Sequence, residues 1–301
     1  MYYNNDTILY LNGEFVKAID AKTNFYGQTL HYGYGVFEGI RSYKTVSGET
    51  RIFRADAHFE RLKASAAALN LPYTYIKKEL IEATYALLEK NNIQDAYIRP
   101  LVYAPENMGF NRNLESYLVI EAWKMDPFLG EKLLKVKTSS FQRPNPKAFK
   151  IEAKATGHYV NSILASHEAK AAGYDEALLL DMNDHVAEAP GANIFYEKDE
   201  KLVTPSLGYI LPGITRATIF EICTELNVEV IEKEITIQDI YEADAAFFCG
   251  TAAEVIGIES LDDHKFAKPW NDSVCREIQE AYQNIVIENK AVITNEVLGV
   301  E

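Results

Sequence analysis

The alternation of apolar and polar positions over the first 125 residues predicts a sheet packed against two helices. Two alternating runs at 9–11 and 15–16 flank Asn12 and Gly13, which is typical of a β-hairpin. Apolar residues at helical spacing predict a helix after Asp56, which can cap it. The other periodic runs predict a second helix and two further strands, at 77–90, 96–104 and 116–124.

The rest of the chain predicts a second, larger unit. Proline and glycine interrupt the pattern at 126–132, which we interpret as a linker between two domains, 1–125 and 133–301. Strands are expected at 133–141, 176–181, 186–195, 228–231 and 245–248. Helices are expected at 159–172, 237–243 and 270–289, and residues 211–216 open a further helix that reaches residue 226. This mixture of helices and strands predicts an α+β protein.

Composition narrows the function classes. The 301 residues are 48% hydrophobic, which suits one large or two medium domains with real cores. A net charge of −14 disfavours nucleic acid as a partner. No apolar run approaches a membrane span, and the first residues lack the features of a signal peptide. Three scattered cysteines and six histidines without metal-ligand spacing predict no disulfide framework and no metal site, and favour the cytoplasm.

Lys154 is the most informative single residue. Between it and Glu168 no other side chain carries a full charge. Desolvation disfavours the ammonium form, so a lysine in such surroundings can become a nucleophile. Taken alone, such a lysine is more often an ordinary surface lysine at the start of a helix, and only the other features of the chain favour the reactive role.

Other stretches carry candidate chemistry. Glycines alternate with aromatic residues over 30–43, where they indicate either a pocket wall or a bulged strand. Tyr97 and Arg99 share one face of a predicted strand, from which the arginine can hold a carboxylate, although a surface arginine is the default. The turn at 211–216 leaves free N–H groups at a helix start, and the small residues at 250–254 offer more of them to an anion.

Together these features match the needs of pyridoxal 5′-phosphate. Its aldehyde needs an unprotonated amine, its phosphate needs helix N–H groups and an arginine, and its ring nitrogen needs a carboxylate. Each match is weak by itself, and the combination is stronger.

Five ordered motifs carry a resemblance to a known family. The chain resembles the branched-chain amino acid aminotransferases of fold type IV over nearly its whole length. The motifs that carry it are residues 31–41 (HYGYGVFEGIR), 97–100 (YIRP), 154–159 (KATGHY), 211–216 (LPGITR) and 250–254 (GTAAE). The resemblance implies a two-domain fold with a small N-terminal α/β domain, a larger domain with mixed sheets, and the cofactor at their interface.

The resemblance also implies the cofactor contacts. Lys154 would form the Schiff base with pyridoxal 5′-phosphate and then carry the proton from the substrate. Glu188 would pair with the ring nitrogen, and Tyr159 with the ring hydroxyl. Leu211 would pack against the ring. The phosphate would be held by Arg61, Ile214, Thr215 and Thr251.

On the substrate side, the resemblance implies transfer of the amino group of L-leucine, L-isoleucine or L-valine to 2-oxoglutarate. Tyr97 and the backbone at Thr251 and Ala252 would orient the α-carboxylate, while Arg99 would recognise the distal carboxylate from the rim, together with Tyr32 of a neighbouring subunit in a homodimer or larger homo-oligomer. The side-chain pocket would be walled by Phe37, Trp123 and Tyr159.

One departure from the family and three alternatives stay open. Ala189 and Pro190 follow Glu188 where many relatives are glycine-rich, and proline fixes the backbone and removes an N–H. On the same fold, a D-amino acid aminotransferase or an aminodeoxychorismate lyase would also use a lysine and a glutamate. An idle cofactor-binding or scaffold protein would be expected to have lost one of them.

Overall fold

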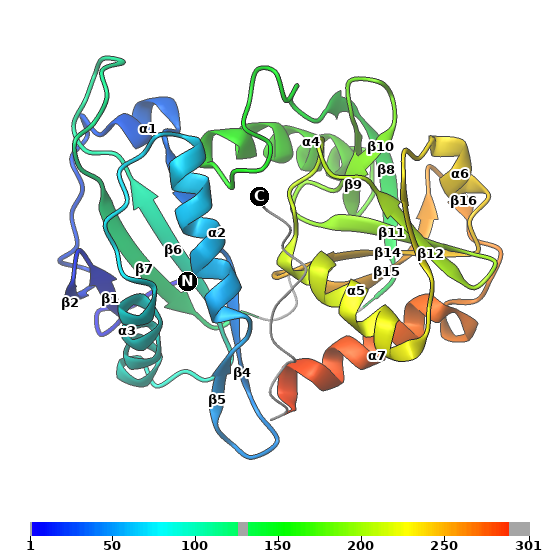
Figure 1. Ribbon diagram of the computed structural model, residues 1–301, viewed down its shortest axis with the longest axis horizontal. Helices are drawn as coiled ribbons and strands as arrows, with labels where there is room; N and C mark the ends of the chain where they lie inside the picture. The colour runs from blue at the N-terminus through cyan, green and yellow to red at the C-terminus, as the bar shows by residue number, and fades with distance from the viewer. Residues whose placement is uncertain (1, 126–131, 289–301) are drawn as a thin grey trace.

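The described part of the protein, residues 2–125 and 132–288 of a computed structural model, forms two sheets that lie side by side (Figure 1). The first sheet contains β1 (Ile8–Leu11), β2 (Glu14–Lys17), β3 (Gly35–Phe37), β4 (Ile40–Lys44), β5 (Thr50–Ile52), β6 (Ala96–Tyr103) and β7 (Tyr117–Trp123). The interval 126–132, expected as a linker, lies almost wholly outside the described residues. The domain boundaries therefore stay a prediction.

The first sheet is antiparallel, in the order β2-β1-β7-β6-β4-β5, with β3 also paired to β6. The hairpin predicted at its start is confirmed, since β1 pairs with β2 from Ile8 opposite Lys17 onward. Asn12 and Gly13 both have positive φ, at 49° and 99°. Two positive φ angles are what the tight hairpin turn requires, and asparagine and glycine accept them most readily.

Two helices, α2 (Ala55–Ala68) and α3 (Lys77–Lys90), pack their apolar stripes on this sheet. Phe59 and Leu62 are buried in the shared core with Ile98. The expectation that Asp56 caps the first helix was wrong, because α2 already begins at Ala55, with Arg54 as its N-cap. Asp56 instead lies in the first turn, where a negative charge favours the helix dipole.

A short helix, α1 (Gln28–Tyr32), precedes β3 and was not predicted. Gly33 ends it in the left-handed conformation, with φ 64°. A Cβ on Gly33 would lie 2.6 Å from Gly157 Cα, so glycine is required here both for its conformation and for a close backbone contact. The glycine–aromatic stretch thus forms a helix, a turn and two strands.

The second sheet is mixed and partly closed. Its strands are β8 (Leu134–Gln142), β9 (Glu176–Leu180), β10 (Val186–Glu188), β11 (Asn193–Lys198), β12 (Lys201–Pro205), β13 (Val230–Lys233), β14 (Ala245–Gly250), β15 (Glu254–Leu261) and β16 (His264–Lys265). β10 pairs with both β9 and β11, so that β10, β9, β8, β15, β14 and β11 form a ring. The predicted hairpin around 183–184 is confirmed as β9 and β10.

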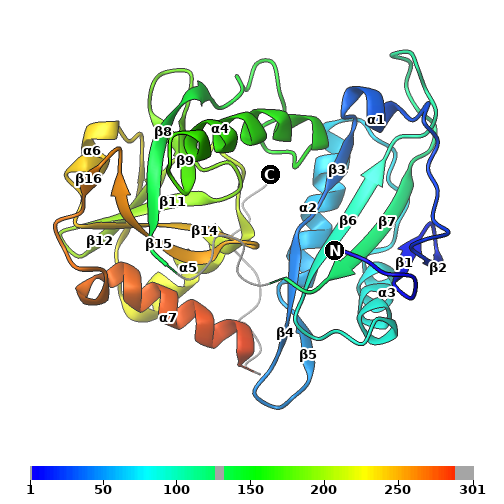
Figure 2. The ribbon, with the colours of Figure 1, turned by 180° about the vertical axis from the view of Figure 1, so that it is seen from behind.

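The helices of this half pack against the strands of the ring. They are α4 (Tyr159–Ala171), α5 (Ile214–Leu226), α6 (Ile237–Tyr241) and α7 (Val274–Ile287), with 3-10 turns at Thr156–His158 and Trp270–Asp272. Seen from behind, α7 runs below the second sheet toward β4 and β5 (Figure 2). Tyr43 and Phe53 of the first half share a buried cluster with Ile219 and Tyr282 of the second, so the halves are packed together. Within the described residues, no helix has the length and apolar character of a membrane span.

Candidate active site

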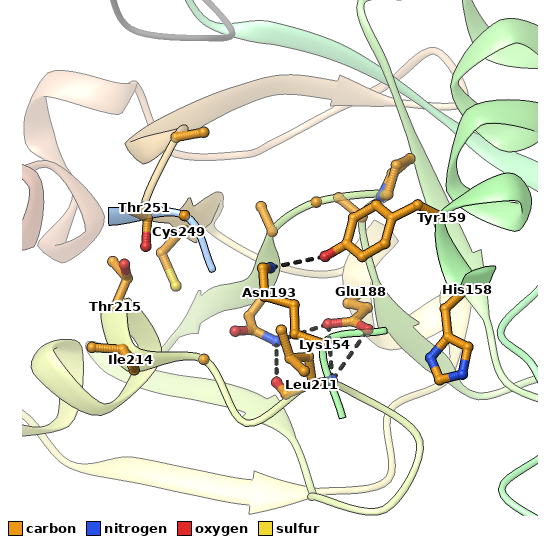
Figure 3. A pocket seen from close by; sticks show the side chains of 18 of the residues that line it. Lys154, His158, Tyr159, Glu188, Asn193, Leu211, Ile214, Thr215, Cys249 and Thr251 are labelled. Atoms are coloured by element: carbon orange, nitrogen blue, oxygen red, sulfur yellow. Dashed lines mark hydrogen bonds between the residues drawn. The ribbon is translucent and has the colours of Figure 1, made fainter. Parts of the chain in front are cut away.

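A pocket takes its walls from both halves of the molecule (Figure 3). The first half contributes Gly39, Arg61 and Tyr97, and the second half contributes the remaining lining residues. All eight residues predicted to bind the cofactor line it: Arg61, Lys154, Tyr159, Glu188, Leu211, Ile214, Thr215 and Thr251. The fold therefore brings together side chains that are separated by up to 190 positions in the chain.

The segment that carries Lys154 is tied to the first sheet by its main chain. The Lys154 N–H donates to Ser65 Oγ at 3.0 Å, and the Phe37 N–H donates to the Lys154 carbonyl at 3.0 Å. Gly157 N–H donates to the Gly33 carbonyl, also at 3.0 Å. Because these bonds come from the other half of the molecule, packing of the two halves fixes the position of the lysine.

The Lys154 side chain ends among aromatic residues. Its Nζ donates to the Tyr159 hydroxyl at 2.8 Å. The same nitrogen lies 5.2 Å from the centre of the Phe37 ring and 5.3 Å from that of Tyr159. None of the ion pairs formed by the described residues involves Lys154, whose Nζ is held by the Tyr159 hydroxyl instead. The arrangement leaves the amine available to an electrophile in the pocket.

Glu188, at the end of β10, is only 5% exposed and is surrounded by donors. Arg143 Nη2 lies 2.9 Å from its Oε1. The Leu211 N–H donates to Oε1 at 3.2 Å, and the Asn193 side-chain amide donates to Oε2 at 3.0 Å. Burial raises the pKa of the Glu188 carboxyl, and Arg143 acts in the opposite direction. The carboxylate is thus held in one orientation at the pocket wall.

Sequence reasoning missed Arg143 and Asn193. Arg143 lies in the loop after β8, where it looked like any polar loop residue. Asn193 begins β11 beside the Glu188 turn, and its Nδ2 also donates to the Leu211 carbonyl at 3.1 Å. Neither position carries a motif, and only the closing of β10 onto β11 brings Asn193 to the carboxylate.

The opposite end of the pocket presents backbone N–H groups. Helix α5 starts at Ile214 with Gly213 as its N-cap, and no side chain caps it. Its first N–H groups are therefore open to an anion, and the helix dipole favours negative charge there. A Cβ on Gly213 would lie 2.0 Å from Asn193 Oδ1, so only glycine allows this approach. Thr215 and Thr251 line the same region.

Of the eight predicted substrate residues, four line the pocket itself: Tyr97, Tyr159, Thr251 and Ala252. Three more, Phe37, Arg99 and Trp123, lie next to Tyr97 and Tyr159. Arg99 Nη2 donates to the Tyr97 hydroxyl at 3.1 Å, and its guanidinium lies 4.6 Å from the centre of the Phe37 ring. As predicted from the strand period, Tyr97 and Arg99 share one face of β6.

Tyr32 lies apart from this pocket in the same chain. Its hydroxyl donates to the Met108 carbonyl at 3.1 Å, and its ring contacts Phe110 with centroids 5.5 Å apart. Both Tyr32 and Phe110 are exposed, at 45% and 90%. A role for Tyr32 in the site would require a second subunit, as the resemblance implies.

The residues present fit pyridoxal 5′-phosphate. A buried carboxylate lies at one end of the pocket, an amine at its side, and uncapped helix N–H groups with Arg61 at the other end. These are the three groups that a pyridine nitrogen, an aldehyde and a phosphate need. Among the described residues, no cluster of histidine, cysteine and carboxylate side chains could hold a metal ion.

The family comparison agrees with this site. The family model described as "Amino-transferase class IV" matches residues 35–261. The branched-chain-amino-acid aminotransferase of Pseudomonas aeruginosa is 43% identical over 289 residues, 94% of each chain. A relative of this similarity, aligned over nearly the full length of both chains, places the whole pocket within the matched region.

Solved structures agree as well. A branched-chain aminotransferase from Thermoproteus uzoniensis, in a structure with norvaline, has a TM-score of 0.90 at 36% identity and covers 93% of this chain and 95% of its own. The branched-chain amino acid aminotransferase from Thermobaculum terrenum, in its PLP-form, has a TM-score of 0.87 at 32% identity, covering 94% of each chain. The expected α+β fold of fold type IV is confirmed.

Proposed function

This chain belongs to the class IV amino-transferases, and on that premise we propose that it is a branched-chain-amino-acid transaminase dependent on pyridoxal 5′-phosphate. It would transfer the amino group of L-leucine, L-isoleucine or L-valine reversibly to 2-oxoglutarate. The observation that carries the proposal is one pocket lined by the Lys154 amine, the buried Glu188 carboxylate and the open N-terminus of α5.

Each end of the pocket has a task toward the cofactor. When bound, pyridoxal 5′-phosphate supplies an aldehyde for attachment and a protonated ring that takes up electrons. Lys154 Nζ would be the attachment point. Glu188 would accept the ring N–H, Tyr159 would hold the ring hydroxyl, and Leu211 would pack on the ring. Arg61, Ile214, Thr215 and Thr251 would hold the phosphate.

Lys154 also moves the proton. Its Nζ, held 2.8 Å from the Tyr159 hydroxyl, would accept the proton of the substrate α-carbon as a general base and later give it up as a general acid. The main-chain bonds to Phe37 and Ser65 hold the lysine segment in place, so only the side chain needs to move during the reaction. A fixed backbone and a free side-chain end suit a lysine that acts first as a nucleophile and then as a base.

Substrate recognition uses the wall beside Tyr97. Tyr97 and the backbone at Thr251 and Ala252 bind the α-carboxylate. The side-chain pocket is walled by Phe37, Trp123 and Tyr159. The Arg99 guanidinium lies 4.6 Å from the centre of the Phe37 ring and 5.9 Å from that of Trp123, so an aliphatic chain would contact the rings while a distal carboxylate would bind the arginine.

The proposal extends to assembly and location. Tyr32 and the exposed Phe110 lie together on the first half, away from the pocket of their own chain. We expect a homodimer in which Tyr32 completes the partner's substrate pocket. A cytoplasmic location fits the three free buried cysteines.

A half-reaction panel tests the substrate class. The cofactor absorbance of the loaded protein is followed after adding L-leucine, L-isoleucine, L-valine, L-glutamate or D-alanine. We expect the four L-amino acids to bleach the band and D-alanine to leave it unchanged. Bleaching by D-alanine alone would favour a D-amino acid aminotransferase, and no bleaching by any of them would favour a lyase.

A further inference from the structure

A buried carboxylate and a buried histidine lie behind Arg61, outside the pocket lining. Glu38 follows β3 and is 0% exposed, and His58 on α2 is 1% exposed. Arg61 Nε donates to Glu38 Oε1 at 2.6 Å, and Nη2 donates to Oε2 at 2.9 Å. This is the two-pronged arginine–carboxylate geometry, which fixes direction as well as distance.

His58 holds the other side of the carboxylate. Its Nδ1 lies 2.7 Å from Glu38 Oε2, and the Gly39 N–H donates to the same oxygen at 3.2 Å. An ionised carboxylate can only accept, so Nδ1 carries the proton and donates it. Burial opposes ionisation of Glu38, but Arg61 and His58 together hold its pKa well below the usual range. Glu38 therefore cannot turn without losing several bonds.

Counting the N–H groups of Arg61 shows how many are free to bind a ligand. A guanidinium has five N–H groups. Glu38 takes two of them, and the Pro212 carbonyl takes one from Nη1 at 3.0 Å. One N–H is left on each terminal nitrogen of a side chain that lines the pocket. Since Pro212 immediately precedes the N-cap Gly213, the same arginine is tied to the start of α5.

We propose that Glu38 and His58 are positioning residues that hold Arg61 against the N-terminus of α5, so that a phosphate meets two aimed N–H groups. The inference rests on the proposed cofactor, which brings the phosphate. A long arginine side chain loses much conformational freedom when it binds. Here that freedom is lost on folding, which favours binding of the phosphate.

The test compares two ligands that differ only in the phosphate. Apoprotein is titrated with pyridoxal 5′-phosphate and with pyridoxal, and affinities are read from absorbance. We expect Glu38→Gln to weaken pyridoxal 5′-phosphate by about 10- to 100-fold and pyridoxal by less than about threefold. His58→Leu weakens the phosphate ligand in the same selective way. His58→Asn, whose amide can replace the Nδ1–H donor, stays near the wild type.

The matched control is Glu60→Gln, the same change next to Arg61 on α2. Glu60 is half exposed and pairs with Lys77 at 2.8 Å, away from the pocket. It should change neither affinity. If Glu38→Gln fails to fold, the two His58 variants decide. Equal weakening of the binding of both ligands would mean that Glu38 and His58 have a merely structural role. Tighter binding of pyridoxal 5′-phosphate by the variants would mean that Glu38 competes with the phosphate for Arg61. Either result overturns the proposal. A wild-type protein that binds neither ligand would instead overturn the proposed function, and this inference with it.

Discussion

Arg143 Nη2 lies 2.9 Å from Glu188 Oε1, and the side chains of both residues are 7% exposed. The pair lies at the end of the pocket assigned to the ring nitrogen. Burial raises the pKa of the Glu188 carboxyl, and Arg143 counters this effect more than any other group. The charge state of Glu188 in the folded protein therefore depends on a loop arginine.

Replacing Arg143 with methionine should leave a buried carboxylate without its cation. Removing one partner of a buried pair destabilises a protein by about 3 kcal/mol or more at neutral pH. The pKa of Glu188 should rise further, so the folded state binds a proton more tightly than the unfolded state. Stability is then retained at low pH and lost as pH rises above the ordinary carboxyl range. Urea unfolding of apoprotein between pH 5 and pH 8 measures this.

The control for Arg143→Met is the double variant with Glu188→Gln, which removes the charge itself. It should recover most of the lost stability and abolish the added pH dependence. An Arg143→Met protein as stable as the wild type at pH 8 would show that Glu188 does not need its cation.

The buried side chains of His58 and Glu38 should make the folded protein less stable in acid. Burial is the main cause that lowers the pKa of His58 below 6.5, and the pKa of Glu38 is also lowered, because Arg61 and His58 outweigh burial. Both groups bind fewer protons when folded. The free energy of unfolding should therefore fall as pH drops below about 6.5, and further below the ordinary carboxyl pKa.

His58→Asn should remove the loss of stability below about pH 6.5, because asparagine does not titrate. Unfolding by urea from pH 8 to pH 5 should show a flatter pH profile for His58→Asn than for the wild type. His31→Asn is the control, since His31 is exposed on α1. A wild-type profile that is flat from pH 8 to pH 5 would contradict the assignment of a buried neutral histidine.

Tyr159→Phe removes the hydroxyl that accepts from Lys154 Nζ at 2.8 Å. The ring that packs on Phe37, with centroids 4.8 Å apart, is kept. We expect the variant still to attach the cofactor, with kcat lower by about 10- to 100-fold. Spectra of the loaded protein and steady-state rates with L-leucine separate the two effects. Unchanged kcat would mean that the hydroxyl has no part in orienting the amine or the ring.

Arg99→Leu should affect the two half-reactions differently. Losing the guanidinium removes the partner of a distal carboxylate, so KM for 2-oxoglutarate should rise by about 10- to 100-fold. The half-reaction with L-leucine should change by less than about threefold, because an aliphatic chain needs only the apolar wall. Equal effects on L-leucine and L-glutamate would place Arg99 in general packing of the wall and not in carboxylate recognition.

The sequence predicted most elements because local signals were strong. Asn12-Gly13 marked its hairpin, and the apolar stripes marked α2, α3, α5 and α7. Helix α1 was missed because five residues give too little periodicity to distinguish a helix from a turn. The cap of α2 was misplaced because Arg54 takes a left-handed conformation that its residue type does not announce.

The pocket residues that lie within a sequence motif could be predicted. Lys154, Glu188 and the start of α5 each stood in a recognisable local pattern. Arg143 and His58 did not, because their roles arise from neighbours that are 45 and 20 positions away in the chain. Such long-range pairing leaves no period or motif, and it becomes visible only when the sheets close.

The central claim is that Lys154 is the lysine that binds the cofactor, and borohydride reduction tests it most directly. Protein loaded with pyridoxal 5′-phosphate is reduced, digested and mapped by mass spectrometry, with Lys154→Ala treated in parallel. The account predicts that the phosphopyridoxyl group is found on Lys154 and that the variant carries none and shows no turnover. A label on another lysine of the wild type, or turnover by Lys154→Ala, would contradict it.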